Sequence, residues 1–141
     1  MGAVMPRIDQ WDVRLNDAIQ DTTARDYALG DADCFANTAD IVQAMTGQDI
    51  ISEWRGQYDT LIGAARVIKN ASYDGVTDWL DTITDTRIEP LKAQRGDIVA
   101  RGLSRAIPSL GICVGDKALL FVHNVGAIYK PMNTVEAAWR V

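Results

Sequence analysis

The segment RGDIVARGLSRAIPSLGICVGDKALLFV, residues 95–122, decides the fold, because the pattern of apolar residues changes where it begins. From Arg95 onward, apolar and often β-branched residues stand in short runs separated by glycine, which is typical of strands. We expect strands at 97–100, 110–114, 118–122, 126–129 and 138–141. Gly-Asp-Lys at 115–117 predicts a hairpin turn, since glycine tolerates positive φ and aspartate hydrogen-bonds to local backbone. The sequence therefore predicts a small antiparallel β-meander over about 96–141.

The part of the chain before Arg95, about 8–85, repeats its apolar residues at helical spacing instead. Three helices are expected from apolar stripes, and a fourth, shorter helix is expected from Val76 to Ile83. The stripes are Trp11, Leu15, Ala18 and Ile19; Phe35, Ala39, Val42 and Met45; and Leu61, Ala65 and Ile68. Helices followed by a run of strands predict an α+β domain, because parallel strands would need helical crossovers between them.

Length and composition limit what the chain does. With 141 residues, of which 48% are hydrophobic and 23% charged, it is the size of one domain, 1–141, and is able to bury a core. A formal net charge of −5 has the wrong sign for a general nucleic-acid binder. No apolar run approaches the roughly 18 residues that span a bilayer, and the N-terminus lacks the pattern of a signal peptide. We therefore expect no nucleic-acid partner, no membrane span and a protein that stays where it is translated.

The cysteines and the histidine do not form a metal-binding pattern. Cys34 and Cys113 make no CxxC pair, and His123 cannot complete a zinc site with them by spacing alone, so we expect no metal and no cofactor. In a strand from Ser109 to Gly115, Ser109 and Cys113 share one face and stand roughly 13 Å apart at ~3.3 Å per residue. If Ser109 faces Cys34, a Cys34–Cys113 disulfide is out of reach, and both thiols are expected to be free.

The segment LGDADCFA, residues 29–36, places a cysteine at the start of a predicted helix. Asp31 or Asp33 is a good N-cap, so Cys34 is expected in the first turn of that helix. There the helix dipole and unpaired backbone N–H groups favour the thiolate, which suits a nucleophile. The other interpretation is a small buried hydrophobic residue, with the charge of Asp33 opposing thiolate formation.

The order of these motifs resembles the NlpC/P60 superfamily of papain-like cysteine peptidases. Asp33-Cys34 opens a helix, RGDIV at 95–99 opens a strand, and LGICVGD at 110–116 follows. In that superfamily the cysteine begins a helix, a Gly-Asp strand comes next, and an HVGIYLG strand carries the histidine base. The resemblance implies N-terminal helices packed on a small C-terminal antiparallel β-sheet or half-barrel, with Cys34 at the position of the nucleophile.

The same alignment puts Ser109 at the position of the family's base. A serine hydroxyl does not titrate near neutral pH and cannot accept the thiol proton as an imidazole does. His123 lies 14 residues further on, where the superfamily keeps a polar residue that orients the base. His123 is therefore a displaced base, an orienting residue without a base, or an ordinary half-buried side chain.

Three further segments resemble a family of small phage-encoded proteins that look like NlpC/P60 relatives and tend to be encoded among tail genes. They are AMTG at 44–47, EWRGQY at 53–58 and AWRV at 138–141. This resemblance implies a protein of the virion tail that is made and assembled in the bacterial host cytoplasm. It implies other tail-tip or baseplate proteins as partners, and it is compatible with contact to peptidoglycan and with a homo-oligomer in a symmetric tail.

Several aromatic and arginine residues are candidates for a protein interface, where both types are enriched. Expected loop or terminal positions single out Trp54, Arg55, Tyr58, Trp139 and Arg140. The alternative is that each arginine pairs with a nearby acid. Trp11 and Trp79, which lie on helical stripes, are expected in the core.

The leading functional hypothesis is a degenerate NlpC/P60-like domain that has lost peptidase activity and serves as a structural or assembly component of a phage tail tip or baseplate. The alternative is an active cysteine peptidase or amidase acting on peptidoglycan or a tail protein, with Cys34 as nucleophile and His123 as recruited base. A third and weaker hypothesis is an acyl-transfer or redox protein that uses only the thiol.

Overall fold

The computed structural model describes residues 6–84, 87–105 and 107–141. The domain is expected to cover 1–141 and its helical part to end at about 85. Residues 1–5, 85–86 and 106 lie outside the described ranges, so these bounds are not described there. The helices are α1 (Trp11–Thr23), α2 (Cys34–Thr46), α3 (Leu61–Asn70) and α4 (Val76–Ile83), with short 3₁₀ helices η1 (Pro90–Lys92) and η2 (Met132–Thr134). The strands are β1 (Arg87–Ile88), β2 (Ile98–Arg101), β3 (Ser109–Cys113), β4 (Lys117–Val122), β5 (Gly126–Pro131) and β6 (Ala137–Trp139). The expectation of an α+β fold is confirmed, and all four helices begin and end close to the predicted positions.

The strands form one antiparallel sheet in the order β1-β6-β2-β3-β4-β5. Strands β2 to β5 follow one another as the expected meander, but β6 does not extend it from β5. Instead it returns to the far side of β2, where Ala138 pairs with Val99, and it pairs with the two-residue strand β1 on its other side. The expectation of a simple meander is therefore corrected. All three residues of β6 are buried, which suits a strand with neighbours on both sides.

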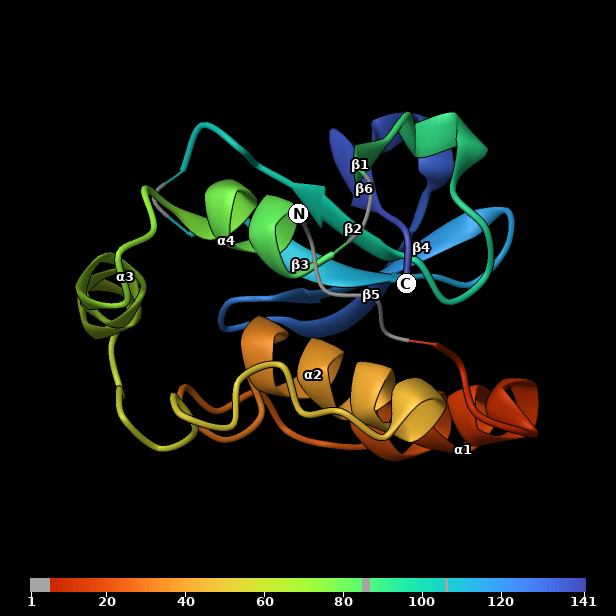
Figure 1. Ribbon diagram of the computed structural model, residues 1–141, viewed down its shortest axis with the longest axis horizontal. Coiled ribbons are helices and arrows are strands. Elements are labelled where there is room, and N and C mark those ends of the chain that lie inside the picture. The colour runs from red at the N-terminus through yellow and green to blue at the C-terminus, as the bar shows by residue number, and fades with distance from the viewer. Residues whose placement is uncertain (1–5, 85–86, 106) are drawn as a thin grey trace.

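The two faces of the sheet have separate apolar layers, because successive side chains of a strand point to opposite faces. Leu110 and Ile112 of β3 face the main core, which includes residues from all four helices. Cys113 lies in a second cluster with Val99, beneath the η2 segment. Figure 1 shows α1 and α2 side by side along one side of the sheet. The predicted alternation along β3 is thus confirmed, and both cysteines are free.

A glycine allows β3 to lie close to its neighbour β4. Gly111 pairs with Leu120, and a Cβ at position 111 would stand 1.7 Å from the carbonyl oxygen of Leu119. Any side chain there would collide with the backbone of β4. The glycine in LGICVGD is therefore required by the packing of the strand that begins at Ser109.

Helix α2 is the central helix, and ten of its thirteen residues are buried. A helix that is apolar on most sides belongs inside a domain, and α2 packs against α1 and against strands β3 and β4. It begins at the side-chain cap of Asp33 and ends at Gly47, whose φ of 79° is the left-handed conformation that favours glycine. Both ends of the helix are therefore fixed, and the position of Cys34 is fixed with them.

The tryptophans expected in the core are placed differently from each other. Trp79 of α4 is buried, and its ring packs against Trp54 with centroids 4.9 Å apart and against Phe35 with centroids 6.0 Å apart. Trp11 is only partly buried at the edge of the core, where the guanidinium of Arg7 lies 4.2 Å from its ring centroid. The prediction is confirmed for Trp79 and needs correction for Trp11, which begins its helix at the molecular surface.

None of the described helices is long and apolar enough to cross a membrane.

Candidate functional site

The start of α2 is organised by the carboxylate of Asp33. Its Oδ1 accepts a hydrogen bond of 2.8 Å from the N–H of Ala36, which makes Asp33, and not Asp31, the N-cap. Its Oδ2 accepts hydrogen bonds from the N–H of Gly30 at 2.8 Å and from the hydroxyl of Tyr58 at 2.6 Å. The predicted capping is confirmed. Cys34 is held as the first residue of the helix by an aspartate whose two oxygens are both engaged.

The loop before the helix depends on a glycine. Gly30 has a φ of 85°, and a Cβ there would stand 2.3 Å from the carbonyl oxygen of Tyr58. Only glycine combines the left-handed conformation with this close approach. Gly30 therefore brings the residues 29–33 into contact with the segment that supplies Tyr58.

The thiol of Cys34 is buried and protonated. Only 4% of the residue is exposed, and Sγ donates a hydrogen bond of 3.7 Å to the carbonyl oxygen of Pro108. Burial raises the pKa of this thiol to about 12, and it outweighs the backbone N–H of Leu110, which lowers the pKa, while the charge of Asp33 raises it further. Of the two interpretations of Cys34, the small buried residue with the charge of Asp33 opposing thiolate formation is the one that agrees with this burial and with the direction of the pKa.

A cavity of about 290 Å³ lies beside this thiol. Its lining brings together the three residues singled out for chemistry, namely Cys34, Ser109 and His123. The remaining lining residues are Tyr27, Leu61, Arg105, Ile107, Pro108, Phe121 and Val122. The start of helix α2, the start of β3 and the residue after β4 therefore converge on one pocket.

His123 lies at the cavity but is not bonded to the thiol. It follows directly after β4, and its ring packs edge-on against Tyr27 with centroids 5.4 Å apart. Its Nδ1 is buried and has no hydrogen-bond partner among the described residues. The Cys34 thiol donates its hydrogen bond to the carbonyl oxygen of Pro108 and not to His123. In the described part of the chain, the thiol proton is therefore not hydrogen-bonded to an imidazole.

Sequence reasoning missed two polar residues of the cavity, Tyr27 and Arg105. Tyr27 lies in the loop after α1, and Arg105 lies in the loop between β2 and β3. Neither belongs to a periodic pattern or a motif. The available signal was their position in loops next to the predicted Cys34 helix and the Ser109 strand, since loops carry many functional side chains.

Two of the five interface candidates are internal. Trp139 is fully buried, and its Nε1 donates a hydrogen bond of 2.8 Å to Oδ1 of Asp81. Tyr58 is buried against Asp33. The expectation that these two residues contact a partner is corrected, because the strand β6 and the loop 47–60 are held inside the domain by their aromatic side chains.

The other three candidates have different surroundings. Arg55 forms ion pairs with Asp49 at 2.7 Å and with Asp40 at 2.6 Å, as the alternative interpretation of the arginines expected. Trp54 is partly buried and lines a cavity of about 300 Å³ next to α4. Arg140 is half exposed, with its Nε 4.0 Å from Oδ2 of the buried Asp97. Trp54, Arg55 and Arg140 thus all keep accessible surface, but the guanidinium of Arg55 is already engaged by two acids.

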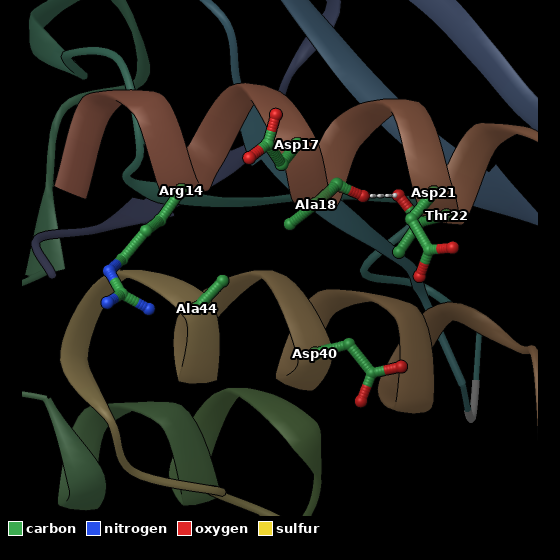
Figure 2. A pocket seen from close by; sticks show the side chains of 7 residues that line it. All are labelled: Arg14, Asp17, Ala18, Asp21, Thr22, Asp40 and Ala44. Atoms are coloured by element: carbon green, nitrogen blue, oxygen red, sulfur yellow. Dashed lines mark hydrogen bonds between the residues drawn. The ribbon is translucent and has the colours of Figure 1, made fainter. Parts of the chain in front are cut away.

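A further cavity, of about 390 Å³, lies between α1 and α2. Figure 2 shows its charged residues, with Asp17 and Arg14 on α1 and Asp40 on α2. Asp40 already accepts hydrogen bonds from Arg25 and Arg55. The lining contains no cysteine, histidine or serine, so it offers no nucleophile beyond one threonine. Among the described residues there is also no group of three or more His, Cys, Asp or Glu side chains placed to hold a metal ion.

Comparison with known proteins identifies a family. The family described as "Domain of unknown function (DUF6950)" matches residues 6–141, so the chain belongs to this family. No curated protein matches the sequence.

Proposed function

We propose that this member of the DUF6950 family is a degenerate NlpC/P60-like domain that does not hydrolyse peptides and acts as a structural or assembly component of a phage tail tip or baseplate. The observation that carries the proposal is the state of Cys34. Its thiol donates a hydrogen bond to the carbonyl oxygen of Pro108, and burial raises its pKa to about 12. In the alignment with the NlpC/P60 superfamily, Ser109 takes the position of the histidine base. A thiol that stays protonated is a poor nucleophile.

The arrangement of the helix and the sheet supports the NlpC/P60 part of the proposal. Cys34 begins a buried helix that packs directly on β3 and β4 of an antiparallel sheet. The Gly-Asp strand β2 pairs with β3 in register, with Val99 opposite Gly111. These are the relationships that the resemblance implies for a papain-like domain.

The proposed role in a phage tail rests on the segments that resemble tail-associated proteins. In the structure, residues of these segments stabilise the fold. Arg55 and Tyr58 of EWRGQY bind Asp40 and Asp33 of the α2 region, so this segment holds a loop against the central helix. Trp139 of AWRV is fully buried on β6, where it pairs with Arg87 of the edge strand β1. These residues therefore stabilise the fold. A stable fold without catalysis is what a domain needs when it only offers a binding surface to other proteins. On this proposal the protein is made in the host cytoplasm and binds other tail proteins.

Two measurements on phage test the proposal. Mass spectrometry of purified particles should find the protein in the virion tail. Phages with Cys34→Ala should assemble and infect normally, whereas Trp54→Ala should reduce tail assembly, since Trp54 keeps accessible surface beside a cavity. A matched control is Tyr129→Ala, an exposed aromatic residue on β5, at the other end of the sheet from β1 and β6. Loss of infectivity with Cys34→Ala in correctly assembled particles would contradict the proposal.

A second candidate function is favoured by one observation. His123 lines the same cavity as Cys34, and its Nδ1 has no hydrogen-bond partner among the described residues. In an active cysteine peptidase or amidase, His123 would take the Sγ proton, and the thiolate would attack the scissile carbonyl while backbone N–H groups at the start of α2 bind the oxyanion. The C–N bond would then break, with the amine leaving with the proton from His123, and water would hydrolyse the thioester to release the acid and restore the thiol. Incubation of the purified protein with peptidoglycan fragments distinguishes the two functions. Cleavage by the natural sequence that is lost in both Cys34→Ala and His123→Ala would establish the peptidase.

A further inference from the structure

Four polar side chains at the Cys34 cavity lack partners within the described residues. They are Arg105, Ser109, Tyr27 and His123, and they come from three loops and the start of β3. The hydroxyls of Ser109 and Tyr27 make no hydrogen bond with other described residues, and the guanidinium of Arg105 makes neither a hydrogen bond nor an ion pair with them. The buried Nδ1 of His123 is also without a partner. Buried polar groups in folded proteins are normally satisfied, so the buried Nδ1 of His123 calls for a partner. The other three side chains line the same cavity with free hydrogen-bonding groups, and a cavity with a few convergent polar groups is typical of a ligand site.

The charge of the lining selects the ligand. The chain as a whole has 19 acidic and 14 basic residues, but the cavity lining contains Arg105 and no acid. Asp33 precedes the lining residue Cys34, but it is fully buried, and its carboxylate oxygens accept hydrogen bonds from Ala36, Gly30 and Tyr58. Guanidinium donors match the two oxygens of a carboxylate, and the hydroxyls add further donors. The polar side of the cavity therefore fits a carboxylate.

The apolar lining residues and the volume of the cavity indicate which chemical group carries the carboxylate. Leu61, Ile107, Phe121 and Val122 form an apolar wall. The volume of about 290 Å³ is at the small end of ligand pockets, so it accepts one apolar side chain together with its carboxylate. Inorganic phosphate would leave the apolar wall without a contact.

We propose that this cavity binds the C-terminal carboxylate of a peptide whose last residue is apolar. The carboxylate lies against Arg105 and the hydroxyls, and the last side chain lies on the wall formed by Leu61 and Phe121. The inference rests on the proposed function in one respect: because the Cys34 thiol stays protonated, the bound peptide is held and not cleaved. The occupant is thus the end of another protein chain, as an assembly component would need.

NMR titration of the full-length ¹⁵N-labelled protein tests the proposal. The probe is N-acetyl-Gly-Gly-Leu, compared with its C-terminal amide, with N-acetyl-Gly-Gly-Gly and with inorganic phosphate. We expect the leucine acid to shift the amide signals of Ile107, Ser109 and Leu110 and of residues 121–123, with at least tenfold weaker binding for each of the other three compounds. Arg105→Gln should weaken binding of the leucine acid at least tenfold. Arg66→Gln, which removes an exposed arginine of α3 outside the cavity lining, should leave it unchanged.

The outcomes separate the two proposals. Equal binding of the acid and the amide, equal binding of phosphate, or no effect of Arg105→Gln would overturn the carboxylate site. Arg105 is exposed, so its substitution leaves the core intact and the result is interpretable. Mass spectrometry of the same samples detects cleavage. Cleaved peptide would overturn the non-hydrolytic function, whereas uncleaved peptide with no binding would overturn only the carboxylate site.

Discussion

Tyr58 donates a hydrogen bond of 2.6 Å to Oδ2 of Asp33, and so links a loop to the N-cap of the helix that begins with Cys34. The two residues are 25 positions apart in the sequence. Burial and the neighbouring carboxylate raise the pKa of Tyr58, so its hydroxyl stays a donor at all ordinary pH values. The position of the candidate site thus depends on a contact outside its own segment.

Tyr58→Phe removes this donor and keeps the ring. Hydrogen bonds to charged groups contribute about 1.5–3 kcal/mol, so we expect the free energy of unfolding to fall by roughly 2 kcal/mol, measured by urea denaturation. Tyr129→Phe is the matched control, since Tyr129 is 52% exposed, and it should change stability by less than about 0.5 kcal/mol. Equal effects of the two substitutions would show that the bond to Asp33 contributes nothing.

The raised pKa of Cys34 predicts slow alkylation. An ordinary thiol with a pKa near 8.5 is half ionised at that pH, whereas Cys34 with a pKa of about 12 is almost fully protonated. In a Cys113→Ser variant, we expect iodoacetamide to react at least a hundredfold more slowly with the folded protein than with the urea-unfolded chain at pH 8.5. The folded rate should rise with pH up to about 12. A fast reaction at pH 6–7 would indicate a thiolate.

The same pKa makes stability depend on alkaline pH. The folded state keeps the thiol protonated up to about pH 12, while the unfolded thiol ionises from about pH 9. Unfolding therefore releases a proton in this window, and the contribution of Cys34 to stability, fully present below pH 9, is lost as the pH rises through it. We expect the free energy of unfolding to fall less steeply between pH 9 and 11 in Cys34→Ala. Parallel pH curves for the two proteins would refute this.

Ser109→His tests whether the missing base explains the inert thiol. An imidazole at the start of β3 would stand in the cavity beside Cys34 and accept its proton. We expect the alkylation rate of Cys34 at pH 7 to rise at least tenfold. Ser104→His, at an exposed position of the loop that precedes β3, is the control and should leave the rate unchanged. An unchanged rate in a folded Ser109→His protein would mean that burial alone keeps the thiol inert.

Asp40 joins two arginines on the helical side of the molecule. It accepts hydrogen bonds of 2.5 Å from Arg25 and 2.6 Å from Arg55, with a quarter of its side chain exposed. Partly exposed ion pairs contribute little, so we expect Asp40→Asn to lower stability by about 1 kcal/mol at low salt and by less in 1 M NaCl. Asp26→Asn, an exposed acid in the loop after α1, should have no comparable effect in the same urea titration.

The helices and the position of Cys34 at the start of α2 could be predicted from local sequence. The apolar residues around Trp79 predict α4 from Val76 to Ile83 as observed, and Asp33 is one of the two predicted caps before Cys34. Such features depend on residues within one or two turns of one another. For this reason they are readable without knowledge of the rest of the chain.

The parts that sequence reasoning missed are set by contacts distant in sequence. The position of β6 beside β2 depends on pairing of Ala138 with Val99, and Tyr27 and Arg105 join the cavity only because two loops meet there. The protonated state of Cys34 is a further case. The capping pattern is the same for an exposed and a buried thiol, and burial, which dominates its pKa, is a property of the whole fold.

The position of β6 also has a consequence for how the sheet is completed. Strands β1 and β2 do not pair with each other, and each borders the segment 137–139, which lies about forty to fifty residues further along the chain. Closing loops of this length is slow compared with forming the hairpins of β2 to β5. A folding intermediate with its helices and hairpins formed would therefore expose the apolar edge of β2. Until β6 covers it, that edge is open to strands of other chains.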